Sequence, residues 1–197
     1  MRPRVFIIHG WDDSPHNGWF PWLQKRLTEQ GIEVHAPAMP DAAHPDIETW
    51  VTFLKHLVGV PDAQTYFIGH SIGCQTILRY LQTLPNEVQV GGVVMVAGWV
   101  TLKPEAMEDE ATAAVALPWL QRPLDWFKIR RHVSSVTAIM SDNDQFVPIE
   151  DGQVFVRELG AHLVVEHQQK HLGGFDGVTV LVSAQRALEE MMQPRSE

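Results

Sequence analysis

Short apolar runs alternate along the chain with segments in which apolar residues return every three or four positions. The runs have the length of buried strands, and the recurring spacing is that of a helix with one buried stripe. The expected strands span 4–8, 32–35, 65–68, 91–97, 137–140 and 163–166, and the expected helices lie near 19–30, 47–57, 72–84, 151–159 and 178–192. This alternation predicts an α/β fold, a three-layer α/β/α sandwich around a sheet of about six parallel strands.

One stretch, residues 101–130, interrupts the alternation. It holds three prolines, a patch of acidic residues and three tryptophan or phenylalanine side chains. A short cap over the carboxyl edge of the sheet would have this composition, and so would a loop packed elsewhere. With 197 residues the chain fits a single domain, 1–197, in which 101–130 is the candidate cap segment.

The balance of charge narrows the classes of partner. Asp and Glu number 24 against 15 Lys and Arg, which gives a formal net charge of −9. Nucleic acids and anionic membrane surfaces both require a basic face, so neither is expected as a partner. No apolar run reaches the roughly 18 residues of a transmembrane helix. The single cysteine, Cys74, cannot form an internal disulfide, which suits the cytoplasmic location that we expect.

The strongest local pattern is Gly69-His70-Ser71-Ile72-Gly73, which follows the strand at 65–68 and opens the helix near 72–84. A serine between glycines at such a strand-to-helix turn is typical of a nucleophile elbow. The two glycines prevent side chains from colliding where the turn is sharp. The alternative is a serine that only caps the next helix.

A serine hydroxyl needs a base within hydrogen-bond reach, and in an elbow site the acid and then the histidine follow the serine in the chain. Asp144, directly after the strand at 137–140, and His171, in a glycine-rich loop, satisfy that order. Asp142 occupies the same turn, and we expect it to brace the turn through its own backbone. The histidines include no His-Glu-x-x-His motif, so neither a metal nor another cofactor is expected.

The oxyanion of such a reaction needs two backbone N–H donors. Ile72, after the serine, supplies one, and the loop that begins at His9-Gly10-Trp11 supplies the other. We expect the second donor to be Trp11, with Asp12 as the alternative. If the strands are ordered 2-1-3-4-5-6, the first and third are neighbours at the switch point, where ligands bind outside the carboxyl ends.

Longer stretches resemble the small serine hydrolases related to retinoblastoma-binding protein 9 and their bacterial relatives. The resemblance is carried by GWFPWL at 18–23, MPD at 39–41, IGHS at 68–71, RPLDWFKI at 122–129 and SDND at 141–144. The Arg-Pro-x-x-Trp-x-x-Ile run is the specific marker, because the fold in general does not require it.

This resemblance implies a minimal α/β-hydrolase fold with little cap and a triad of Ser71, Asp144 and His171. Two departures matter. Retinoblastoma-protein binding is associated with a Leu-x-Cys-x-Glu motif, which the surroundings of Cys74 do not match, so that binding is not expected. Lys170 stands where the family loop often has a glycine before its histidine.

The expected function is that of a carboxylesterase-like serine hydrolase. It would cleave an ester, thioester or amide bond of a small-molecule substrate through an acyl-enzyme. Tryptophans close to the expected active site suggest that the substrate carries an apolar acyl or aromatic group, although core packing explains most of these tryptophans equally well. The alternative is a catalytically weak binding protein with the α/β-hydrolase fold.

Overall fold

Six parallel strands form one sheet in a computed structural model that describes residues 2–193 of the chain. Their order is β2-β1-β3-β4-β5-β6, which is the order 2-1-3-4-5-6 that places the first and third strands side by side. The strands are β1 Arg4–Ile8, β2 Glu33–His35, β3 Thr65–His70, β4 Gly92–Val96, β5 Val136–Ser141 and β6 His162–Glu166. The α/β sandwich predicted from the alternating pattern is confirmed.

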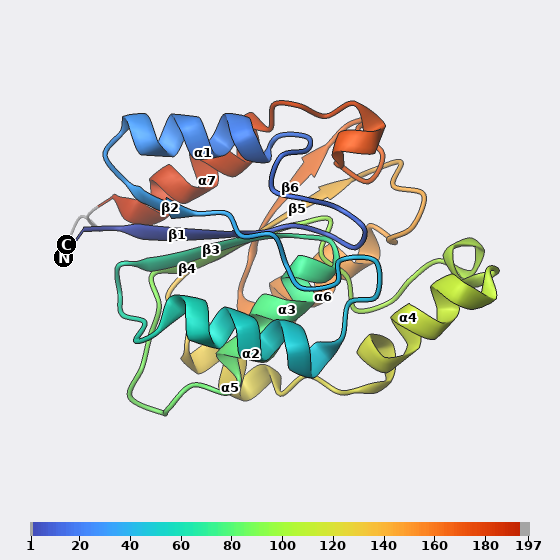
Figure 1. Cartoon of the computed structure of the whole chain (residues 1–197), viewed down its shortest axis with the longest axis horizontal. Helices are drawn as coiled ribbons and strands as arrows, with labels where there is room; N and C mark the ends of the chain where they lie inside the picture. Colours follow the sequence, from blue (N-terminus) through green and yellow to red (C-terminus); the bar gives the residue numbers. More distant parts are fainter. Residues whose placement is uncertain (1, 194–197) are drawn as a thin grey trace.

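Helices cover both faces of the sheet. On one face lie α1 Phe20–Glu29 and α7 Val182–Met192, and on the other lie α2 Ile47–Val58, α3 Ile72–Leu81, α5 Trp126–Arg131 and α6 Glu150–Leu159 (Figure 1). Strand β1 shows how the sequence produces the two layers. Phe6 and Ile8 pack into the core on the α2 and α3 side, whereas Val5 and Ile7 pack into the core on the α1 and α7 side. Successive side chains point to opposite faces, so a strand covered on both sides is apolar throughout.

The interrupting stretch divides into two parts with different positions. A 3₁₀ helix η1 Pro104–Met107 and helix α4 Glu110–Gln121 lie beyond the carboxyl edge of the sheet, whereas α5 packs beside α3 and α6 (Figure 1). The sequence did not indicate α4 as a helix. It buries only Ala116 and Trp119 and contains Pro118, so it lacks the apolar stripe that identified the other helices.

Both ends of the part that holds η1 and α4 are fixed by buried charged side chains. The Asp151 carboxylate on α6 accepts hydrogen bonds from the N–H groups of residues 100 and 101, over 2.7 and 2.8 Å. At the other end, the Arg79 guanidinium on α3 donates to the carbonyls of Trp119 and Arg122, over 2.6 and 2.9 Å. The intervening residues therefore cross the edge of the sheet between two fixed points.

Within residues 2–193, no helix combines the length and the apolar character that crossing a bilayer requires.

Candidate active site

Ser71 lies at the sharp turn between β3 and α3. Its φ and ψ are 53° and −120°, a backbone conformation that residues other than glycine rarely adopt. The turn is held by the Ser71 N–H, which donates to the Val96 carbonyl, and by the Ser71 carbonyl, which accepts from the Cys74 N–H. The Ser71 hydroxyl makes no capping bond to α3, so the alternative of a simple helix cap is not what the structure contains.

The two glycines of the pattern are required for different reasons. A Cβ on Gly69 would come within 2.7 Å of the Cys74 backbone nitrogen, inside the turn itself. A Cβ on Gly73 would instead meet the carbonyls of Ile8 and His9 on the neighbouring strand. The sequence pattern predicts that both collisions lie within the turn. For Gly73 this is wrong, because the start of α3 packs directly against the end of β1.

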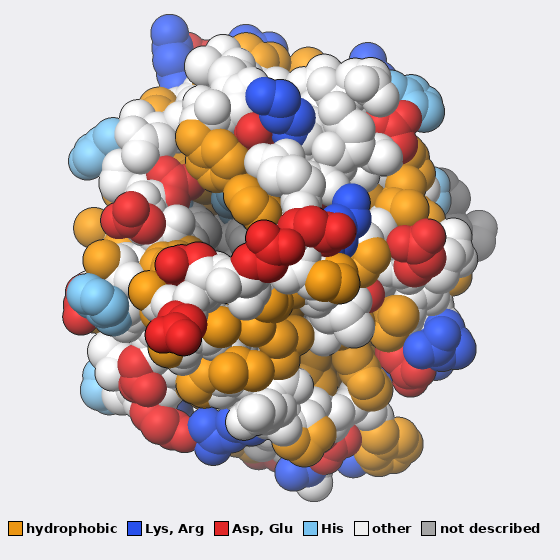
Figure 2. All heavy atoms as spheres, turned by 90° about the vertical axis from the view of Figure 1, so that its right-hand side faces the viewer, with side chains coloured by type: hydrophobic (Ala, Val, Ile, Leu, Met, Phe, Trp, Pro, Cys, Tyr) orange, Lys and Arg blue, Asp and Glu red, His pale blue; other side chains and the backbone are white. Residues whose placement is uncertain are grey.

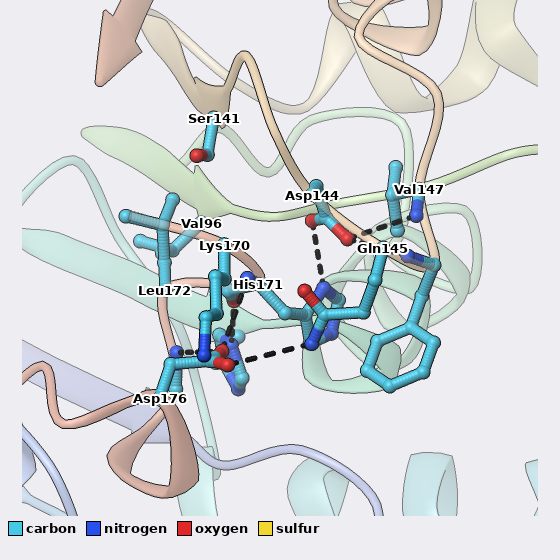
Figure 3. Close-up of polar contacts among 12 residues, drawn as sticks. Val96, Ser141, Asp144, Gln145, Val147, Lys170, His171, Leu172 and Asp176 are labelled. Atoms are coloured by element: carbon cyan, nitrogen blue, oxygen red, sulfur yellow. Dashed lines mark hydrogen bonds and ion pairs between the residues drawn. The ribbon is translucent and has the colours of Figure 1, made fainter. Parts of the chain in front are cut away.

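Asp144 and His171 form a buried hydrogen-bonded pair (Figure 3). The distance from Asp144 Oδ2 to His171 Nδ1 is 2.7 Å, and the two side chains are only 1% and 6% exposed. The other carboxylate oxygen accepts from the N–H groups of Phe146 and Val147, over 2.8 and 3.0 Å. These bonds fix the orientation of the carboxylate toward the imidazole, in the way that an acid orients a catalytic histidine.

Asp142 faces a different partner. Its carboxylate accepts from His167 Nδ1 over 2.7 Å and from the Gln168 N–H over 2.9 Å. These bonds, first of all the one from the Gln168 backbone, lower the pKa of Asp142. Asp142 therefore braces the loop after β6 and not its own backbone, and it is Asp144 that bonds to backbone N–H groups a few residues ahead.

The loop that carries His171 is strained and tightly held. Gln168, Lys170 and Leu172 have φ values of 57°, 51° and 60°, all in the left-handed region. A glycine would adopt that conformation at position 170 without this strain. Here the Lys170 N–H is fixed by Asn143 Oδ1 over 2.8 Å.

Two side chains that sequence reasoning did not single out hold the backbone of His171. Asp176 accepts from the His171 N–H over 3.0 Å, and His70 Nε2 bonds to the His171 carbonyl over 2.9 Å. Burial, together with the nearby His171, lowers the pKa of His70 to about 4. His70 is therefore neutral near pH 7, and because its partner is a carbonyl, Nε2 carries the proton.

The loop after β1 distinguishes the two candidate oxyanion donors. The Asp12 N–H donates to the Ala42 carbonyl over 2.7 Å, so it is already engaged. For the Trp11 N–H, no acceptor lies within residues 2–193. Of these two candidates, Trp11 is therefore the one whose backbone donor is free to meet a ligand.

These residues converge on one cavity of about 460 Å³. Ser71 and His171 line it together with Trp11, Asp12 and Ile72, whereas Asp144 lies behind His171. Its apolar wall is formed by Trp99, Leu102, Ala106, Val115, Ala116, Phe146 and Phe175, several of which belong to the stretch that holds η1 and α4. Lys103 joins that stretch to the acid loop, since its N–H donates to the Phe146 carbonyl over 2.9 Å.

Acidic side chains surround the opening of the cavity, on the face shown in Figure 2. Asp12, Asp13, Glu105 and Asp109 contribute to its lining, and among the described residues no lysine or arginine does. The same part of the chain holds no cluster of three or more His, Cys, Asp or Glu side chains placed to bind a metal ion.

The sequence is similar to a known family and to two known proteins. A family model described as serine hydrolase matches residues 5–190. The Bacillus subtilis protein YdeN is 33% identical over 182 residues, which cover 92% of each chain. The rat serine hydrolase RBBP9 is 28% identical over 156 residues, covering 79% of this chain and 78% of its own.

Solved structures show the same similarity. The crystal structure of the B. subtilis ydeN gene product has a TM-score of 0.87 at 29% identity, over 96% of this chain and 98% of its own. Est1E from Butyrivibrio proteoclasticus has a TM-score of 0.72 at 14% identity, over 97% and 88% of the two chains, and shares the fold alone.

Proposed function

The chain belongs to the serine hydrolase family, and on that premise we propose that it hydrolyses an ester, thioester or amide bond of a small substrate through an acyl-enzyme on Ser71. The observation that carries the proposal is the buried Asp144–His171 pair at a cavity that Ser71 also lines. We propose a carboxylesterase-like activity, because the cavity wall next to Ser71 is mostly apolar and would accept the acyl group of a small ester.

In the proposed mechanism, His171 removes the proton of the Ser71 hydroxyl as its oxygen attacks the substrate carbonyl. Asp144 keeps the proton of the imidazole on Nδ1, so that Nε2 is the base. The N–H groups of Trp11 and Ile72 stabilise the oxyanion. The imidazolium then protonates the leaving group, and water hydrolyses the acyl-enzyme. No step requires a metal or another cofactor.

The apolar wall of the cavity indicates the kind of acyl group that the substrate carries. Residues from η1 and α4 meet Trp99, Phe146 and Phe175 around the space next to Ser71. We propose that this part of 101–130 acts as a small cap that encloses an apolar acyl or aromatic group. The carboxylates at the opening favour neutral or cationic substrates over anionic ones, because a cleft lined by one sign of charge repels ligands of the same sign.

The alternative is a binding protein that keeps the fold with weak catalysis. A fluorophosphonate probe separates the two, because it reacts only with a serine that a working base activates. We expect labelling at Ser71, and we expect Ser71→Ala to remove it. The same substitution should lower kcat for the hydrolysis of 4-nitrophenyl acetate by a factor on the order of 10⁴–10⁶. A variant that kept a tenth of the wild-type rate would exclude Ser71 as the nucleophile.

A further inference from the structure

His9 lies directly behind the loop that follows β1. The side chain is 1% exposed and packs edge-on against Trp50, with 5.7 Å between the ring centroids. Gly10 and Trp11 line the cavity, whereas His9, among the described residues, does not. Its imidazole therefore lies outside the cavity, against Trp50 of α2 and the Met39 backbone.

Both nitrogens of the His9 ring have partners, and these define its tautomer. The Met39 N–H donates to Nε2 over 2.9 Å, so Nε2 carries the lone pair. Nδ1 lies 2.8 Å from the Gly10 carbonyl oxygen, which can only accept. Burial lowers the pKa of His9, so the ring is neutral near pH 7, and its one proton is on Nδ1 and is donated to Gly10.

The Gly10 carbonyl and the Trp11 N–H belong to the same peptide unit. The peptide is trans, so its C=O and N–H point in opposite directions in one plane. With the carbonyl held toward His9, which lies outside the cavity, the N–H points away from His9, and the two residues that form this peptide line the cavity. A Cβ placed on Gly10 would be 3.5 Å from the Ser71 Cβ, so this peptide is next to the candidate nucleophile.

We propose that His9 is a positioning residue that orients and polarises the Gly10–Trp11 peptide, so that the Trp11 N–H meets the oxyanion formed at Ser71. A hydrogen bond accepted by a peptide carbonyl strengthens the donor at the other end of that peptide. His9 touches neither the substrate nor the reacting atoms. This inference rests on the proposed function and adds to it a residue outside the cavity.

A matched pair of variants separates this role from simple support of the fold. Asn carries its amide nitrogen at the δ position, as does His Nδ1, so His9→Asn keeps a donor for Gly10 and loses the acceptor for Met39. Gln reaches the ε position, so His9→Gln keeps the acceptor and loses the donor. Removing a whole oxyanion donor costs about 10²–10³ in kcat, so misaligning one in His9→Gln should cost roughly tenfold to a hundredfold, with little change in KM.

His9→Asn should show the reverse pattern, with kcat near wild type and a lower unfolding temperature, because the Met39 N–H is left buried without an acceptor. A trifluoromethyl ketone, whose adduct with Ser71 carries an oxyanion, should bind His9→Gln more weakly by the same factor as the loss in kcat. If both variants lose kcat equally, or if His9→Gln keeps the wild-type kcat, the inference is wrong.

A spectroscopic measurement on the wild-type protein tests the inference even if His9→Gln does not fold. The ¹⁵N spectrum should show His9 as the Nδ1–H tautomer, and the Trp11 amide proton should move downfield when the trifluoromethyl ketone binds. The Nε2–H tautomer, or an unmoved Trp11 amide in a protein that fluorophosphonate labels at Ser71, would overturn the role of His9 alone. Absence of labelling at Ser71 would overturn the proposed function, and this inference with it.

Discussion

His70 donates through Nε2 to the backbone carbonyl of His171 over 2.9 Å, so the residue before the candidate nucleophile holds the residue that is the candidate base. The two rings are 5.0 Å apart, and His70 is 2% exposed. The bond joins the β3–α3 turn to the histidine loop across 101 residues of sequence. It supports a loop in which three residues other than glycine adopt left-handed backbone angles.

Loss of this bond should reduce catalysis by displacing the base. We expect His70→Leu to lower kcat for 4-nitrophenyl acetate by roughly 10-fold to 100-fold, because a displacement of about 1 Å at a catalytic group costs on that order. His70→Gln places an amide donor at the ε position and should retain most of the activity. Equal losses in the two variants would show that the His171 carbonyl does not need a donor.

His70 should also make the stability of the protein fall in acid. Its pKa is 6.5 in an unfolded chain and about 4 in the folded protein, so between these values the unfolded state binds a proton that the folded state does not. The free energy of unfolding should therefore fall as the pH drops from 7 to 4, by an amount on the order of 2–3 kcal/mol from this group.

Urea unfolding of wild type and His70→Gln at pH 7.5, 6, 5 and 4 measures this contribution. The difference between the two proteins isolates His70 from the carboxylates that titrate in the same range. We expect the gap between their free energies of unfolding to narrow, or change sign, toward pH 4. A constant gap would mean that His70 has the same pKa in both states.

Asp144→Asn should lower kcat far more than Asp142→Asn. Only Asp144 bonds to His171 Nδ1. The side-chain amide in Asp144→Asn would permit the wrong tautomer of His171, at a cost of roughly 10³–10⁴ in kcat. Asp142 braces the loop through Gln168 and His167, and its amide should cost tenfold or less. Both variants are compared on one ester, and a reversed order would transfer the acid role to Asp142.

Substrate charge should affect kcat/KM. We expect acetate esters that differ only in a trimethylammonium or a carboxylate group on the alcohol to differ by about tenfold in favour of the cation at low salt, with the ratio falling as salt is added. Asp12→Asn with Glu105→Gln should reduce the ratio and leave a neutral ester unaffected, because both side chains lie at the opening. Equal kcat/KM values for the two charged esters would show that the carboxylates at the opening do not select substrates by charge.

The fold could be predicted largely from the sequence. Apolar strand runs and helical stripes predicted the sheet and five of the helices that pack on it, α1, α2, α3, α6 and α7, because burial on two faces leaves a regular pattern. The short helix α5 was not predicted. The structure brings Ser71 and His171 to one cavity, with Asp144 behind His171, since the carboxyl ends of parallel strands share an edge. Their catalytic roles stay predictions that the variants above test.

Other features leave no pattern in the sequence. His9, His70 and Asp176 act through bonds from a side chain to a backbone group, and no fixed spacing identifies such bonds. The reason for Gly73 also required the structure, because the carbonyls that exclude a side chain there belong to β1. Helix α4 escaped prediction since it covers an opening and not the sheet, so its sequence is not selected for one buried face.

The anchoring of the stretch over the cavity has a consequence for protein engineering. Asp151 fixes its start and Arg79 fixes its end, and both belong to helices that pack on the sheet. Residues 104–118 can therefore be exchanged as a cassette between two fixed attachment points, provided that Lys103 is kept beside the acid loop. Libraries confined to that cassette would vary which acyl groups enter while the reacting residues stay in place.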